Sequence, residues 1–186
     1  MKKINYVTGN IKKFKNAENF FKNKNFILTQ KKVEIYEIQG LDAISITKSK
    51  AEQAWQKIKK PLFVNDAYWI IPALKGFPGP YMKYINTWFT PQDILNLMKD
   101  KIDRKIILRD TIVYIDDKKT KIFTNDHEGT ILKSMYCGEY VNPTDAVISL
   151  SKSGKSIAEE TKNKNLFLKG EDILWNNFLD WLKINL

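Results

Sequence analysis

Residues Ile4–Asn10, which read INYVTGN, place a short apolar run directly before a Thr-Gly-Asn turn. After this turn, Phe14, Ala17 and Phe20 recur at helical spacing. An apolar run, a tight turn and an amphipathic segment predict a strand, a turn and a helix in that order. This order is typical of an α/β fold.

Further along the chain, the apolar run Leu62–Val64 predicts a buried strand that delivers Asn65 and Asp66 at its end. Other patterns predict further strands at Lys31–Ile38, Ile106–Ile115, Lys121–Phe123 and Gly129–Leu132, and helices at Asp42–Lys57, Tyr81–Trp88, Thr90–Lys99 and Asp172–Ile184. We therefore expect a single α/β domain over residues 1–186, with a mixed, elongated central sheet flanked by helices. This order also allows two lobes with the active-site cleft between them.

The composition is that of a globular protein with an excess of lysine. Hydrophobic residues make up 43% of the chain, and 31 Lys+Arg against 21 Asp+Glu give a formal net charge of +10. Two interpretations stay open, a solvated lysine surface and attraction to a polyanion, which includes a nucleoside triphosphate. Only Arg104 and Arg109 are arginines, so a nucleic-acid partner is the least favoured interpretation.

The single cysteine, Cys137, excludes an intramolecular disulfide framework and fits a reducing compartment. The sequence has no signal-peptide pattern, and no apolar stretch approaches the ~20 residues of a membrane span. We expect a cytoplasmic protein without a membrane-spanning segment.

The turn Thr8-Gly9-Asn10, followed by Lys13, is the first candidate site. Glycine allows the backbone to approach a phosphate, a helix N-terminus offers free N–H groups, and Lys13 adds positive charge one turn into the helix. The same residues also form ordinary turns. The local sequence leaves a phosphate cradle and a plain turn as alternatives.

Asp66 and Glu37 form the second candidate site, because each is predicted near the end of a strand. Two carboxylates are suitable ligands for Mg²⁺ on a triphosphate, but a turn cap and a solvated side chain are the alternatives. A third segment, Lys152–Ser156, resembles the end of a P-loop. It is excluded, because the P-loop pattern requires glycine at position 149, where this chain has Ser149.

Together, these segments resemble the inosine triphosphate pyrophosphatase family, which hydrolyses non-canonical purine nucleoside triphosphates. Val7–Lys13 is similar to the family's T-G-N-x-x-K phosphate loop, and Tyr36–Gly40 is similar to the segment with a metal-binding glutamate. Ile44–Lys48 is similar to the helix whose lysine faces the phosphates. Ala73–Tyr81 follows the pattern A-L-x-G-x-P-G-x-Y at the same spacing.

The chain departs from the family on the predicted catalytic strand and in its second half. Position 65 is Asn65 where the family has glutamate, and Ala67 replaces a small hydroxyl residue. The aromatic-Gly-Trp-Asp segment that reads the base is reduced to Asp145, and the Glu-Lys-Asn segment is reduced to Lys164-Asn165. The family's Ser-His-Arg segment is missing. The losses in the second half concern base recognition, so the resemblance implies mostly intact phosphate handling and an altered base preference. Asn65 removes one carboxylate that could share the metal-binding or base role.

The resemblance implies Mg²⁺-dependent hydrolysis of a nucleoside triphosphate to the monophosphate and pyrophosphate, by a homodimer. The alternative is a degenerate member that binds nucleotides or a partner without catalysis. The implied roles are catalysis by Asp66 and Lys13, metal binding by Glu37 and Asp66, and substrate binding by Thr8, Gly9, Asn10, Lys13, Lys48, Asp145 and Lys164.

Overall fold

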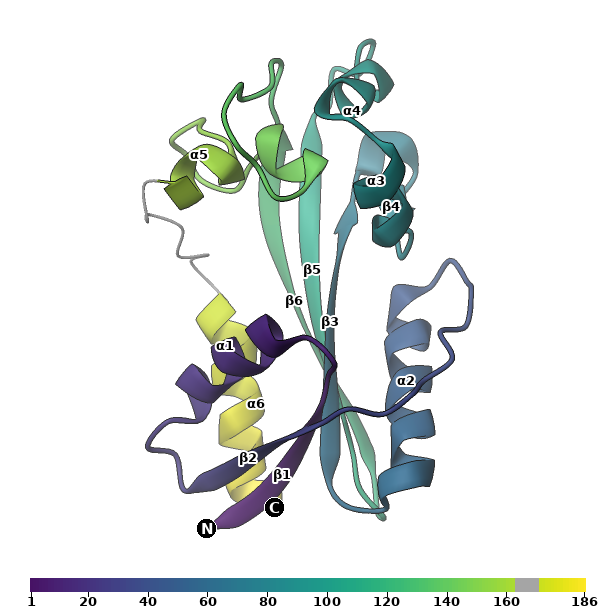
Figure 1. Cartoon of the computed structure of the whole chain (residues 1–186), viewed down its shortest axis with the longest axis vertical. Helices are drawn as coiled ribbons and strands as arrows, with labels where there is room; N and C mark the ends of the chain where they lie inside the picture. The colour runs from purple at the N-terminus through teal and green to yellow at the C-terminus, as the bar shows by residue number, and fades with distance from the viewer. Residues whose placement is uncertain (163–170) are drawn as a thin grey trace. The chain divides into compact units, whose positions relative to one another are not determined.

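The computed structural model describes residues 1–162 and 171–186. Its elements in chain order (Figure 1) are β1 (Lys2–Val7), α1 (Ile11–Phe21), β2 (Phe26–Lys31), α2 (Ala43–Ile58), β3 (Leu62–Ile70), η1 (Pro72–Leu74), β4 (Pro78–Gly79), α3 (Met82–Trp88), α4 (Pro91–Leu97), β5 (Lys105–Ile115), β6 (Thr120–Ile131), η2 (Pro143–Ala146), β7 (Ile148–Ser149), α5 (Ile157–Lys162) and α6 (Glu171–Asn185).

The strands form one seven-stranded sheet in the order β2-β1-β3-β5-β6-β7, with β4 paired to β3. β1 is parallel to both β2 and β3, whereas β4 is antiparallel to β3 and β7 is antiparallel to β6. Helices accompany this mixed sheet, which confirms the predicted α/β class.

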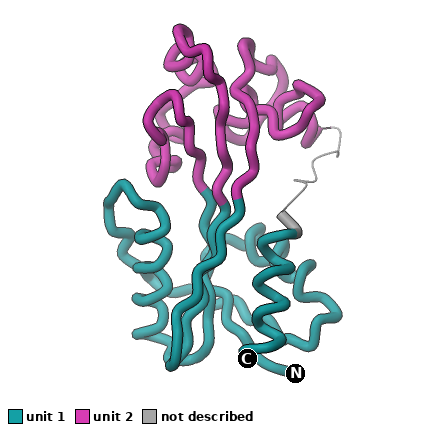
Figure 2. The backbone as a smooth tube through the Cα atoms, turned by 180° about the vertical axis from the view of Figure 1, so that it is seen from behind, with its two compact units in different colours: residues 1–67, 110–125, 170–186 teal, residues 68–109, 126–169 magenta. Residues whose placement is uncertain are grey.

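The chain divides into two compact units, which Figure 2 colours separately. Unit 1 contains residues 1–67 and 110–125 together with α6, and unit 2 contains residues 68–109 and 126–169. Strands β3, β5 and β6 contribute residues to both units.

The two sheet faces of unit 1 carry different helices. On one face, Tyr6, Phe63 and Tyr114 pack in a buried cluster with residues of α1 and α6. On the other face, Val64 and Val113 pack with the alanines of α2. We call these the α1 face and the α2 face. Because side chains alternate along a strand, each face takes every second residue of β3 and β5.

The predicted helices agree with the structure, because their start signals are local. The side chain of Asp42 accepts from the backbone N–H groups of Ile44 and Ser45 at the start of α2. Thr90 forms a capping box with Asp93 at the start of α4, with Pro91 at the first helical position. The apolar side of α6 is buried, as Leu174 and Phe178 show, whereas Ile173 is 55% exposed.

The predicted strand at Lys31–Ile38 is wrong. The strand in this region is β2, which pairs with β1 from Lys2↔Phe26 to Val7↔Lys31. Residues 32–42 have no strand or helix, because β1 ends at Val7 and offers no further partner. Val33 and Ile35 alternate with exposed residues in this loop and are half-buried against the α2 face.

Two further strand boundaries also differ from the prediction. β3 continues to Ile70, so Asn65 and Asp66 lie in its middle and not at its end. The apolar residues after Asp66 extend the strand, and Trp69 and Ile70 pair with β4. The strand predicted at Gly129–Leu132 is the last part of β6.

Candidate active site

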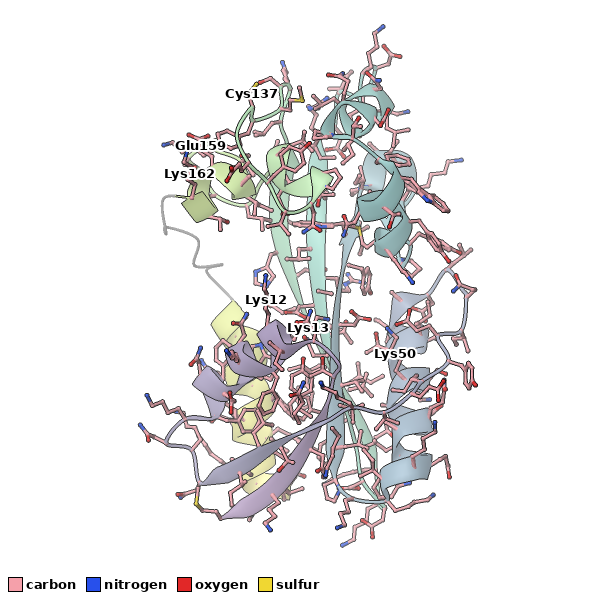
Figure 3. All side chains as sticks on the ribbon, in the orientation of Figure 1. Lys12, Lys13, Lys50, Cys137, Glu159 and Lys162 are labelled. Carbon is pink, nitrogen blue, oxygen red and sulfur yellow. The ribbon has the colours of Figure 1, made fainter. Side chains whose placement is uncertain are left out.

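Asp66 lies at the centre of a group of charged side chains within unit 1. β1 pairs with β3 only as far as Tyr6, which lies opposite Phe63. Asp66 therefore lies beyond the end of the part of β3 that pairs with β1. One carboxylate oxygen of Asp66 is 3.2 Å from the ammonium of Lys13, and the other is 2.7 Å from the ammonium of Lys50. Lys13 comes from α1 and Lys50 from α2, on the two sides of β3 (Figure 3).

The Thr-Gly-Asn turn positions Lys13. The side-chain oxygen of Asn10 caps α1 by accepting from the backbone N–H groups of Lys12 at 2.8 Å and Lys13 at 3.2 Å. The hydroxyl of Thr8 accepts from the backbone N–H of Asn10 at 3.1 Å. Lys13 therefore stands in the first turn of the helix, and its ammonium also donates to the backbone oxygen of Asn65. The space beside Gly9 is open.

Lys50 is the residue that the sequence interpretation missed. It lies between Ile46 and Ala54 at helical spacing, on the side of α2 that packs against the sheet. Its side chain is only 17% exposed. Lys48, which was predicted to face the phosphates, is half exposed and pairs with Glu52 at 3.6 Å. The signal for Lys50 was present in the sequence, because the buried residues of α2 identify its sheet-facing side.

Glu37 joins this group from the loop after β2. One of its carboxylate oxygens is 2.8 Å from the ammonium of Lys50, so this single ammonium bridges Glu37 and Asp66. The side chain of Gln53 holds the loop by donating to the backbone oxygen of Tyr36 at 2.8 Å and accepting from its N–H at 3.0 Å. Lys57 donates to the backbone oxygen of Glu34. Three side chains of α2 thus attach the loop to the helix.

The two lysines determine the charge state of Asp66. Burial alone would raise the pKa of Asp66, but Lys13 and Lys50 outweigh burial and lower it below its usual value. Burial would likewise lower the pKa of Lys50, but Asp66 and Glu37 outweigh it and raise that pKa. Asp66 is therefore a carboxylate at neutral pH, and Lys50 remains an ammonium.

The described residues contain no group of three or more His, Cys, Asp or Glu side chains suited to hold a metal ion. Glu37 and Asp66 nevertheless direct one oxygen each at the same cation, the ammonium of Lys50. Two carboxylate oxygens that converge on one positive charge are a donor set that suits a hard divalent cation.

Two predicted binding residues remain, Asp145 and Lys164. Asp145 lies in unit 2, where its carboxylate accepts from the backbone N–H and the side-chain amide of Asn142 in a capping box. Burial raises the pKa of Asp145 above its usual value. Lys164 lies outside the described residues.

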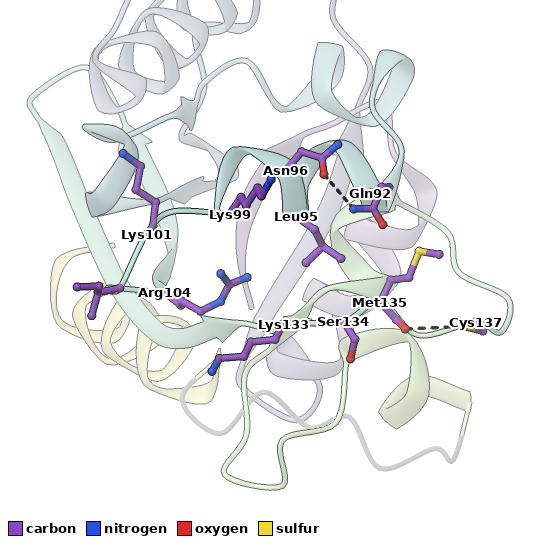
Figure 4. Close-up of a pocket in the computed structure, with 11 residues that line it drawn as sticks. Gln92, Leu95, Asn96, Lys99, Lys101, Arg104, Lys133, Ser134, Met135 and Cys137 are labelled. Atoms are coloured by element: carbon purple, nitrogen blue, oxygen red, sulfur yellow. Dashed lines mark hydrogen bonds between the residues drawn. The ribbon is translucent and has the colours of Figure 1, made fainter.

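Unit 2 has a separate pocket, lined in part by Lys99, Lys101, Arg104 and Lys133 (Figure 4). The guanidinium of Arg104 donates to three backbone carbonyls, those of Met98, Ile131 and Leu132, so this arginine holds the backbone together. Nothing in this pocket resembles the ion-pair group around Asp66.

Comparison with known proteins identifies the relatives of this chain. The Ham1 family matches residues 4–167. The dITP/XTP pyrophosphatase of Pyrococcus horikoshii is 28% identical over 184 residues, covering 99% of this chain and 98% of the relative. That of Saccharolobus solfataricus is 31% identical over 129 residues, covering 69% of this chain and 67% of the relative.

Solved structures of the same family share the fold. A HAM1 protein from Coxiella burnetii superposes with a TM-score of 0.80 at 17% identity, covering 98% of this chain and 99% of the other. The Ham1 protein of Staphylococcus aureus gives 0.78 at 21% identity, covering 98% of each chain. None of the helices in the described part of this chain has the length and apolar character needed to cross a membrane.

Proposed function

The chain belongs to the Ham1 family, and from this premise we propose that it hydrolyses non-canonical purine nucleoside triphosphates to the monophosphate and pyrophosphate. The observation that carries the proposal is the carboxylate of Asp66, which is held ionised between Lys13 and Lys50. The relatives named dITP/XTP pyrophosphatase support dITP and XTP as the substrates to test first.

Lys13 and the start of α1 suit the triphosphate. A helix N-terminus favours negative charge, and the capped first turn of α1 holds Lys13 beside it. In this proposal Thr8, Gly9, Asn10 and Lys13 bind phosphate oxygens, and Lys48 stays a predicted contact at the outer surface of α2. The open space beside Gly9 supports a close approach of the phosphates to the backbone.

Asp66 is the proposed catalytic carboxylate, with Lys13 as its catalytic partner. An ionised carboxylate can orient a water molecule and accept its proton while that water attacks the α-phosphorus. The bond from the α-phosphorus to the bridging oxygen breaks, and pyrophosphate leaves. Lys13 stabilises the negative charge that gathers on the phosphate oxygens.

Enzymes of this family generally need a divalent metal ion, and we propose Mg²⁺ here. Glu37 and Asp66 would hold it, because their oxygens already converge on one cation. Bound Mg²⁺ supplies charge neutralisation on the phosphate oxygens. The three contacts between α2 and the loop keep Glu37 next to Asp66 before any ligand binds.

Base selection is the part of the proposal in which this chain differs from its family. Asp145 and Lys164 remain the proposed base-side contacts. The chain lacks the aromatic-Gly-Trp and Ser-His-Arg segments, so fewer hydrogen-bond donors can face a 6-oxo group. We therefore expect weaker discrimination between purines than such donors would provide. A homodimer and a cytoplasmic location complete the proposal. The homodimer rests on the family resemblance alone, and the cytoplasmic location rests on the single cysteine, Cys137, which fits a reducing compartment.

The test is pyrophosphate release from dITP, XTP, ITP and the common NTPs with Mg²⁺, comparing the wild-type protein with Asp66→Asn. The matched control is Asp180→Asn, which removes an exposed carboxylate that pairs with Lys183 on α6. We expect release by the wild-type protein and the control and its loss in Asp66→Asn. If folded wild-type protein binds triphosphates without releasing pyrophosphate, the chain is a nucleotide-binding protein and the proposal is wrong.

A further inference from the structure

Asn65, directly before the proposed catalytic residue, has a side-chain amide whose orientation is fixed. Its nitrogen donates to a carboxylate oxygen of Asp110 at 2.7 Å and to the backbone oxygen of Thr111 at 3.1 Å. A carbonyl oxygen and a carboxylate are both acceptors, so only the amide nitrogen can face them. Both N–H groups are then used, and the carbonyl oxygen of Asn65 is turned away from β5.

Asn65 and Asp110 belong to the α1 face of unit 1. Phe63 and Ile112, each two residues away on the same strand, pack in the buried cluster of that face. Lys13 reaches the same part of β3, where its ammonium donates to the backbone oxygen of Asn65. The carbonyl oxygen of the Asn65 amide therefore belongs to the side of the sheet from which Lys13 approaches.

The carboxylates of Asp110 and Asp66 both affect the pKa of Tyr6. The hydroxyl-bearing side chain of Tyr6 is fully buried on the α1 face. Burial raises the pKa of Tyr6, and the negative charges of Asp110 and Asp66 raise it further. Both carboxylates thus lie within electrostatic reach of one hydroxyl group, although they come from different strands.

The hydrogen bond to Asp110 explains why position 65 carries an amide. An aspartate at this position would place a carboxylate oxygen against Asp110 and against the carbonyl of Thr111, with no proton to share. Within the pair formed by Asn65 and Asp110, the one negative charge is on Asp110 of β5. Asn65 contributes a neutral acceptor in a fixed direction.

We propose that Asp110 is a positioning residue of the Asp66 site, which holds the Asn65 amide so that its carbonyl oxygen accepts a hydrogen bond from water around the bound triphosphate. This inference rests on the proposed function. Without the Asp110 carboxylate, one hydrogen bond remains, to the backbone oxygen of Thr111 at 3.1 Å, so the amide can rotate and present a donor in place of the acceptor. A misplaced group of this kind costs turnover more than substrate binding.

The test compares kcat and KM for pyrophosphate release across four variants. For Asp110→Ala we expect kcat to fall about tenfold to a hundredfold with little change in KM. Asp110→Asn should remain close to the wild-type rate, since the side-chain oxygen of asparagine still accepts from Asn65. Asn65→Asp should lose activity. The double variant Asn65→Asp with Asp110→Asn should recover part of it, because the new amide at position 110 donates to the new carboxylate, while the carbonyl of Thr111 still faces that carboxylate.

Asp116→Ala is the matched control for lost stability. Asp116 lies directly after β5, two residues beyond Tyr114 on the same face, and accepts from the Tyr114 hydroxyl and from two backbone N–H groups in the following turn. Its removal should lower the melting temperature and leave kcat of the folded protein unchanged.

The outcomes separate this inference from the proposed function. An active wild-type protein with an equally active Asp110→Ala variant refutes the inference alone. So does a double variant that regains the melting temperature without regaining kcat, because Asp110 then has only a structural role. A wild-type protein that releases no pyrophosphate refutes the proposed function and this inference together.

Discussion

Replacing Lys50 by methionine removes one ammonium and keeps most of the side chain's volume. In the wild-type protein this ammonium is 2.7 Å from Asp66 and 2.8 Å from Glu37. After the change, Asp66 keeps only Lys13 as a cationic partner, and Glu37 loses its contact with the helix. The variant therefore tests whether Lys50 organises the site or only lies beside it.

The size of the effect follows from burial. The side chain of Lys50 is 17% exposed and that of Asp66 is 32% exposed, so the pair is partly shielded from water. A hydrogen bond to a charged group contributes about 1.5–3 kcal/mol to the free energy of unfolding. The loss stays below that of a fully unpaired buried charge, since Lys13 remains. For a chain of this size, the melting temperature should fall by roughly 3–12 °C.

The assay is thermal unfolding at neutral pH together with the pH dependence of pyrophosphate release. Because Lys50 lowers the pKa of Asp66, its removal should move the acid limb of the rate profile to higher pH. Lys48→Met is the stability control, since its exposed pair with Glu52 at 3.6 Å contributes only about 0.2–1 kcal/mol. A Lys50→Met protein with wild-type melting temperature and an unshifted acid limb would refute the argument.

Two further predictions concern acid stability and the Glu37 loop. The pKa of Asp66 is lower in the folded protein than in the unfolded chain. Its contribution to stability is therefore present above the unfolded value of about 3.9 and is lost as the pH falls through the folded value. Below about pH 4, urea midpoints should fall more steeply for the wild-type protein than for Asp66→Asn, and equal slopes would contradict this. Gln53→Leu removes both hydrogen bonds to the backbone of Tyr36, so the Mg²⁺ concentration for half-maximal activity should rise, whereas Gln56→Leu, which loses only a contact with Lys59, should leave it unchanged.

The fold was predictable where the signals were local. Asp42 and Thr90 cap helices through backbone groups two or three residues away, and such contacts can be inferred from short sequence patterns. The predicted strand at Lys31–Ile38 is wrong because alternating apolar and polar residues indicate a half-buried segment. They do not indicate whether that segment pairs with another strand. Val33 and Ile35 bury one side against the α2 face without a strand partner, and only the end of β1 at Val7 decides this.

The site was predictable residue by residue but not as a set of contacts. Asp66 and Lys13 were each found from their own surroundings, and the structure brings them to 3.2 Å across 53 positions of sequence. Lys50 was missed although the buried face of α2 carries its signal. The pair of Asn65 and Asp110 has no such signal, because its hydrogen bond depends on how β3 and β5 align.

The net charge of +10 does not by itself select a ligand at this site. Both arginines are engaged inside unit 2, Arg104 with backbone carbonyls and Arg109 with both carboxylate oxygens of Asp126 at 2.6 Å. The excess charge lies on lysines, most of them exposed. Their field attracts any polyanion over a long range and is screened by salt.

Selectivity must come from the local balance of charge around Asp66. There, the two ammonium groups of Lys13 and Lys50 face the two carboxylates of Asp66 and Glu37, so the group is formally neutral. A polyanion gains little binding energy from this neutral group unless the lysines and the carboxylates release one another and bind the ligand in their place. In the proposed function, phosphate oxygens bind Lys13 in place of Asp66, and Asp66 and Glu37, once they release the Lys50 ammonium, would hold the divalent cation. A ligand that brings only negative charge can bind the ammonium groups, but the carboxylates of Asp66 and Glu37 then have no cation and repel the ligand. A triphosphate with its metal ion offers anionic oxygens to the lysines and a cation to the carboxylates. A site built from ion pairs of both signs therefore suits this ligand better than it suits a nucleic acid held by charge alone.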